Sequence, residues 1–179
     1  MRKFIGIVVL VCFLFLNYGC KKKITQFSMD YNSELVIGSS FEQLIPFSVS
    51  TPESETNSSY EFDAHDTDAD RVKSIFLKSM VLSITSPVNK KFTFLKSVII
   101  YIDSPNQPEV KLASKENIDN SVGNQITMDL VDLDLKEYLK DKTFVLRLQV
   151  TTDETLPEDV HINVYTDFLV DAKVIRFKK

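Results

Sequence analysis

Apolar residues alternate with polar ones along most of the chain after about residue 26, which is the pattern of half-buried β-strands. The clearest alternating stretches are 126–130, 144–150 and 160–168. Another stretch, 75–84, changes its apolar phase near Lys78 and Ser79, and a β-bulge is the simplest cause of such a change. The continuous apolar run Val98–Ile102 predicts a strand at the centre of a sheet.

Helical periodicity is confined to one short piece, residues 134–140. Asp134 can cap a helix there, and Glu137 stands where a capping box places its acidic residue. About eight strands without βαβ alternation predict an all-β fold, an antiparallel two-sheet sandwich. We expect an immunoglobulin-like Greek key, because a helical turn before a late strand is common where a chain crosses between sheets. A jelly roll or a small barrel is the alternative.

The region between the first strand and residue 74 is predicted to be irregular. Pro46 interrupts the apolar run 41–49, which makes this run an edge strand or a connection. Residues 51–59 are polar and predict an exposed loop. Residues 60–70 are polar and acidic and are predicted to end in a single helical turn.

The first twenty residues form a segment of a different kind. A basic pair, Arg2 and Lys3, precedes an apolar run over residues 4–16. That run has the length of a signal-peptide core and is too short to cross a membrane. It is followed by Asn17-Tyr18-Gly19-Cys20 and then by three lysines, Lys21 to Lys23.

A small residue directly before a cysteine at the end of such a run resembles the lipobox of bacterial lipoproteins, in the relaxed form of Bacteroidetes lipoproteins. The resemblance implies cleavage by a type II signal peptidase between Gly19 and Cys20, and a diacylglyceryl group on the Cys20 thiol. An uncleaved anchor and an ordinary secretory signal are the alternatives. The chain is then divided into a signal peptide (1–19), a lipidated cysteine with a basic tether (20–26) and one β-sandwich domain (27–179).

The same resemblance implies a location. A single acyl chain binds a membrane only reversibly, whereas two or more hold a protein firmly. In Bacteroidetes lipoproteins, acidic residues soon after the cysteine accompany export to the cell surface, but Lys21 to Lys23 are basic. We therefore expect an outer-membrane lipoprotein that faces the periplasm, with its lysines at the lipid headgroups.

Charge and cysteine content narrow the chemistry further. The 179-residue chain has 21 basic and 25 acidic residues, and loss of Arg2 and Lys3 leaves 19 against 25, a net charge of −6. An acidic domain without a basic patch argues against a nucleic-acid partner. Cys12 leaves with the leader and Cys20 carries lipid, so we expect no disulfide and no cysteine-based metal site.

Candidate catalytic groups are sparse. His65 and His161 are the only histidines and have no zinc-binding spacing, and no nucleophile elbow or phosphate-binding glycine loop is present. We therefore expect no enzymatic activity and no cofactor other than the lipid.

One acidic cluster has the spacing that begins a calcium loop, at Asp66, Asp68 and Asp70. An EF-hand needs a glycine and a glutamate at later positions, where this chain has Arg71 and Leu77. A solvated acidic loop, with no metal, is the expected structure, and a looser calcium site is the alternative.

A binding face remains as the candidate functional site. Tyr101, His161, Asn163 and Tyr165 occupy the less apolar phase of their strands, where an aromatic ring can stack on a sugar or anchor a protein. We expect a lipid-anchored, non-catalytic binding or interaction module with a protein or glycan partner. The alternative is a structural subunit of an envelope assembly joined by strand addition, which needs an open sheet edge beside a detachable terminal strand.

Overall fold

The computed structural model describes residues 26–173, and its elements are almost all strands. The strands are β1 (Gln26–Ile37), β2 (Phe47–Ser50), β3 (Ser54–Glu55), β4 (Val72–Ser86), β5 (Leu95–Ser104), β6 (Gln107–Lys115), β7 (Gln125–Thr127), β8 (Asp129–Leu130), β9 (Thr143–Thr152) and β10 (Val160–Ala172). Two short α-helices and one 3₁₀ turn complete the set: α2 (Ser58–Ala64), α3 (Lys136–Leu139) and η1 (Phe92–Phe94).

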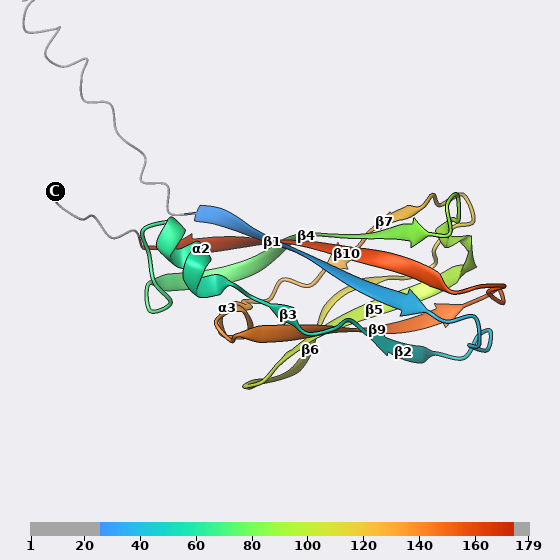
Figure 1. The fold of residues 1–179 in the computed structure, drawn as a ribbon, viewed down its shortest axis with the longest axis horizontal. Helices are drawn as coiled ribbons and strands as arrows, with labels where there is room; N and C mark the ends of the chain where they lie inside the picture. The colour runs from blue at the N-terminus through green and yellow to red at the C-terminus, as the bar shows by residue number, and fades with distance from the viewer. Residues whose placement is uncertain (1–25, 174–179) are drawn as a thin grey trace, which may run out of the picture.

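These strands form two antiparallel sheets packed face to face (Figure 1). Sheet A has the order β1-β10-β4-β7, and sheet B has the order β2-β9-β5-β6-β8, with β3 also paired to β9. The predicted all-β, two-sheet sandwich is confirmed. Its strand order is that of the predicted alternative, the jelly roll, which consists of eight strands in two Greek keys. The eight strands are β1, β10, β4 and β7 in sheet A and β2, β9, β5 and β6 in sheet B.

The immunoglobulin-like order does not fit, because the first strand pairs with the last. β1 lies beside β10 over its whole length, and β2 belongs to the other sheet, whereas an immunoglobulin domain keeps its first two strands in one sheet. The predicted helical turn exists as α3, but it joins β8 to β9 within sheet B. In this part of the chain the change of sheet comes earlier, at Met128 between β7 and β8, and the next one follows only after β9.

The alternation seen in the sequence places the core between the two sheets. Every second residue of β10 from Val160 to Ala172 is buried, and the intervening residues face solvent or are partly covered, except Asp167, which is buried. Phe144 of sheet B and Phe168 of sheet A pack edge to face between the two sheets, and neither has exposed surface. Tyr31 lies edge-on to both rings. Full burial of each phenylalanine contributes about 1.5–3 kcal/mol to folding.

The predicted bulge in β4 is confirmed at Lys78. Asp167 lies opposite Ser79 and Phe168 lies opposite Leu77, so Lys78 has no partner residue on β10. The extra residue lets both halves of β4 keep their apolar side chains inside. The Lys78 ammonium donates a 2.9 Å hydrogen bond to Asp167 Oδ2 on the outer surface of sheet A.

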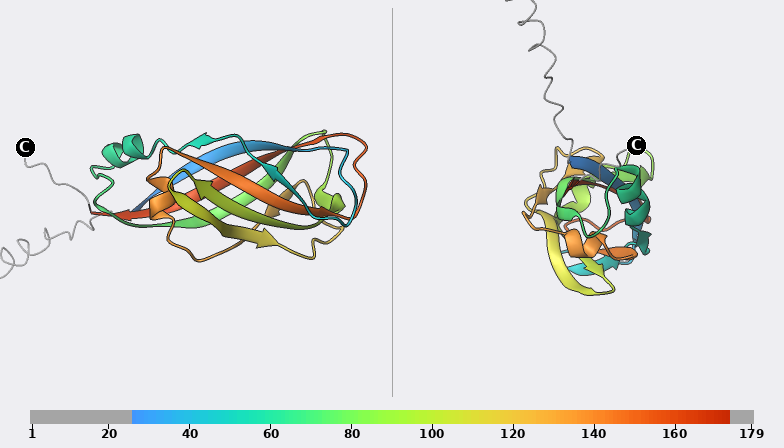
Figure 2. Two further views of the ribbon diagram at one scale, coloured as in Figure 1. Left: turned by 90° about the horizontal axis from the view of Figure 1, so that it is seen from below. Right: turned by 90° about the vertical axis from the view of Figure 1, so that its left-hand side faces the viewer.

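β1 begins and β10 ends at the same end of the elongated sandwich, beside α2 (Figures 1 and 2). The loops 38–46, 87–91 and 153–159 lie at the opposite end. The predicted signal peptide, Cys20 and most of the basic tether lie outside the described residues. Among the residues that are described, no helix has the length and apolar character needed to span a membrane.

Candidate functional site

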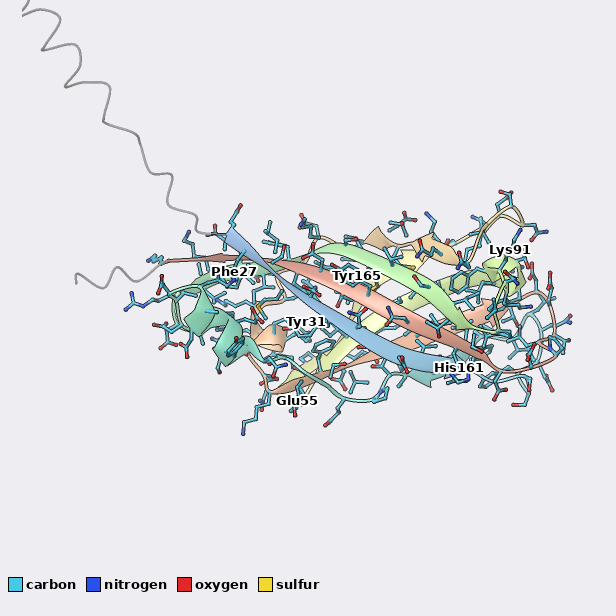
Figure 3. The ribbon with its side chains drawn as sticks, turned by 45° about the horizontal axis from the view of Figure 1, so that its top comes forward. Phe27, Tyr31, Glu55, Lys91, His161 and Tyr165 are labelled. Carbon is cyan, nitrogen blue, oxygen red and sulfur yellow. The ribbon has the colours of Figure 1, made fainter. Side chains whose placement is uncertain are left out.

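Three of the four predicted site residues share the outer surface of sheet A. His161, Asn163 and Tyr165 occupy the solvent-facing positions of β10, since the residues between them point into the core. Figure 3 shows His161 and Tyr165 on this surface. With their neighbours on β1, β4 and β7 they make up what we call the sheet A face: Asn32, Ser83, Gln125, Thr127, His161, Asn163 and Tyr165.

The sheet A face presents amides, hydroxyls, the His161 imidazole and the Tyr165 ring, with the exposed Glu34 carboxylate opposite Asn163 at its β1 border. Tyr165 lies between Asn32 of β1 and Val81 of β4, and it is half-buried by them. The Asn163 side-chain amide donates a 2.9 Å hydrogen bond to Asn32 Oδ1, which fixes the orientation of both side chains. The remaining amide groups stay free to donate or accept.

Tyr101 does not join this face, because β5 belongs to sheet B and its outer side points the other way. Its ring is covered by the Arg147 guanidinium, 4.3 Å from the ring centroid. Arg147 also donates two 2.6 Å hydrogen bonds to the Glu109 carboxylate and one of 3.0 Å to Ser48. This cluster therefore ties β2, β9, β5 and β6 together and leaves Tyr101 a structural role.

We expect Glu109→Gln to lower the free energy of unfolding by about 0.5–1 kcal/mol near neutral pH, the range of an exposed, bidentate ion pair. Hydrogen bonding to Arg147 lowers the pKa of the Glu109 carboxyl. The pair therefore stabilises the fold above the ordinary glutamate pKa of about 4.3, and this stabilisation is lost as pH falls through the lowered pKa. Urea unfolding of both proteins at about pH 7 and about pH 3 measures the difference, and a gap of equal size at both would contradict the assignment.

The acidic cluster is arranged as a self-capped turn. The Asp68 carboxylate accepts hydrogen bonds from the backbone N–H groups of Asp70 and Arg71, and it pairs with the Arg71 guanidinium at 2.8 Å. Within residues 26–173, no three His, Cys, Asp or Glu side chains are grouped so that they could hold a metal ion. His65 stacks on Phe27 with the ring centroids 3.9 Å apart.

The predicted exposed loop at 51–59 is the part of the site region that the sequence missed. Its central residues form β3, which pairs with β9, and Thr51, Thr56 and Ser58 are buried. The segment runs beside β1 and leaves a groove of about 440 Å³ between the two. An alternation this short, with no large apolar residue, carries no clear strand signal.

No protein-family model and no curated protein matches this chain. The fold is similar to a chain of the acid-stable capsid of Helicobacter pylori bacteriophage KHP30, with 8% identity, a TM-score of 0.40 and coverage of 85% of this chain and 99% of that one. It is also similar to a chain of turnip yellow mosaic virus, with 11% identity, a TM-score of 0.31 and coverage of 86% and 97%. TM-scores this low carry no conclusion about function.

Proposed function

We propose that this protein is a non-catalytic binding module, held at the bacterial envelope by a lipid on Cys20, and that the sheet A face binds its partner. The observation that carries the proposal is the gathering of His161, Asn163 and Tyr165 on one polar surface. The leader supports the location through its resemblance to a lipobox.

The chemistry of this face suits a glycan. Sugar hydroxyls both donate and accept hydrogen bonds, as do the Asn32, Gln125 and Asn163 amides, and the apolar side of a sugar ring can pack on Tyr165. On the sheet A face, side chains that can both donate and accept hydrogen bonds lie side by side on all four strands of the sheet. For a lipoprotein that faces the periplasm, peptidoglycan is the glycan within reach.

We expect the mature protein to sediment with isolated peptidoglycan, and Tyr165→Ala and Asn163→Ala to weaken this binding at least tenfold each. Loss of a central aromatic or amide contact costs about 1–2 kcal/mol or more, which corresponds to that factor. Co-sedimentation over a series of peptidoglycan concentrations measures the affinity.

Tyr101→Ala is the matched control, because it removes the same side chain from the central part of the opposite sheet. It should leave binding unchanged. Equal loss in Tyr101→Ala and Tyr165→Ala would show that the effect comes from stability, and no binding by the parent protein would reject the glycan as the partner.

The alternative, a subunit joined by strand addition, is restricted by the place of the terminal strand. β10 lies between β1 and β4 and is paired along its length on both sides. Withdrawing it would split sheet A, so it is not a detachable donor strand. Acceptance of a strand from elsewhere at the β1 edge is the form of this alternative that the topology supports.

A further inference from the structure

The outer edge of β1 is an unpaired sheet edge of unusual length. β1 has twelve residues, and within residues 26–173 no strand pairs with it on the side away from β10. In an antiparallel pair, every second residue of an edge strand directs its N–H and C=O away from the partner. β1 therefore presents a row of free backbone donors and acceptors, which is a template for another strand.

The segment 52–57 runs along this edge without covering it. It is joined to β1 by two side-chain contacts, from the Tyr31 hydroxyl to the Thr56 carbonyl at 2.5 Å and between the Ser33 and Ser54 hydroxyls at 2.8 Å. No backbone hydrogen bond connects the segment to β1 in the described part of the chain. The outer edge of β1 and the segment 52–57 are thus the two walls of the groove of about 440 Å³, which we call the β1 groove.

The β1 groove is lined by acidic side chains from both walls. Asp30 and Glu34 stand on β1, Glu53 and Glu55 stand on the opposite wall, and all four are exposed. None of them forms an ion pair or a side-chain hydrogen bond with any residue of 26–173, and no Lys, Arg or His lines the groove. Four uncompensated carboxylates beside a free backbone edge favour a positively charged occupant.

A second copy of the same edge is a poor occupant. Antiparallel pairing of β1 with another β1 would bring Asp30 and Glu34 near the same acids of the other chain, and like charges across strands are destabilising. A mobile small cation would satisfy the charge but would leave the backbone groups unpaired. An extended peptide with basic side chains satisfies both.

We propose that the β1 groove accepts an extended, basic peptide segment of a partner protein, which adds to sheet A as a strand beside β1. Backbone hydrogen bonds to β1 supply the affinity, and lysine or arginine side chains opposite Asp30, Glu34, Glu53 and Glu55 supply the selectivity. The groove adjoins the sheet A face, with which it shares Asn32. Its test measures peptide binding and needs neither glycan binding nor a lipid at Cys20, so the two proposals can fail independently.

The test uses the mature chain and a fluorescent hexapeptide of alternating threonine and lysine, followed by anisotropy at low salt. We expect the Thr-Lys peptide to bind, and a Thr-Glu peptide of the same length not to bind. A Thr-Lys peptide with N-methyl groups on alternate residues keeps its charge but cannot form the ladder, and it should bind at least tenfold more weakly. Equal binding by the methylated peptide would overturn strand addition.

A matched pair of protein variants locates the site. Replacement of the four groove acids together (D30N, E34Q, E53Q and E55Q) should weaken peptide binding by about fourfold or more, because four exposed ion pairs of modest strength are lost together. The control (E116Q, D132N, E154Q and E158Q) removes the same charge from exposed acids outside the groove and should bind as the parent does. Equal weakening in both would reject the groove in favour of net charge.

Hydrogen exchange gives a second, structural readout. Bound Thr-Lys peptide should protect alternate backbone amides within residues 30–34, and unchanged exchange there would overturn the proposal.

This chain's own basic residues at its C-terminal end are tested as an alternative occupant with R176Q, K178Q and K179Q together. If that variant exposes β1 amides that are protected in the parent protein, the occupant is this chain's own tail and not a partner.

Discussion

Replacement of Cys20 by alanine is expected to abolish both lipidation and signal-peptide cleavage. The mature protein purified from the membranes of its native host should have a mass that begins at Cys20 and includes acyl chains. The variant should lose the acyl mass and keep its leader, because the cysteine thiol is the acceptor of the lipid and cleavage follows lipidation in the lipoproteins that this leader resembles. Intact-mass spectrometry of both proteins measures the change.

Cys12→Ala is the control for this experiment. Cys12 lies within the apolar run of the leader and should be removed with it, so the mature mass should be identical to that of the parent. Two acyl chains contribute about 0.8 kcal/mol per buried CH₂, enough to hold the mature protein firmly in the membrane. A parent mass that includes Met1, or that begins at Cys20 without lipid, would reject the lipoprotein assignment.

Much of the fold could be predicted from local pattern. The strict alternation of β10 identifies a strand with one buried face, and the phase change at Lys78 identifies the bulge that the pairing of Asp167 and Phe168 reveals. The predicted helix at 134–140 exists as the shorter α3, whose N-cap position is Leu135 and not the predicted Asp134. Asp134 still acts at this end of the helix, because its Oδ1 accepts the Lys136 N–H. These features depend on interactions between residues close in sequence, so the local sequence pattern is enough to predict them.

Strand partners could not be predicted in the same way. Alternation states which side of a strand is buried, but it does not state which sheet the strand belongs to. Asp134 Oδ1 also accepts the N–H of Ile75 on β4, and Leu135 donates to the Ile75 carbonyl, so the turn before β9 is held against the other sheet. That long-range contact is absent from any local pattern, and the sheet crossover was therefore assigned to the wrong place.

The candidate site likewise combines features that the local sequence predicts with features that depend on strand pairing. Tyr101 and Tyr165 have equivalent positions in their strands, and each is half-buried, but they lie on different sheets. Only the structure shows that Arg147 covers Tyr101, because Glu109 and Ser48, which orient Arg147, come from other strands. The acidic walls of the β1 groove were likewise hidden, since Asp30 and Glu53 become neighbours of one groove only after folding.

Phe168→Ala is expected to produce the largest loss of stability, about 3–5 kcal/mol in the free energy of unfolding. Phe168 has no exposed surface, and its ring lies 5.8 Å from that of Tyr31 and 6.5 Å from that of Phe144. The three side chains come from β1, β9 and β10, so they join the two sheets. Truncation removes the apolar burial and the edge-to-face contacts together and leaves a cavity.

Phe76→Ala is the matched control, because Phe76 lies on the neighbouring strand β4 of sheet A but is 38% exposed. Its truncation should cost less than about 1 kcal/mol. Urea unfolding at neutral pH gives both values, with an unchanged slope as the sign that folding remains two-state. A small domain is stable by about 5–15 kcal/mol, so the Phe168 variant should unfold at a much lower urea concentration. Equal losses in the two variants would mean that the Tyr31–Phe144–Phe168 contacts do not hold the sheets together.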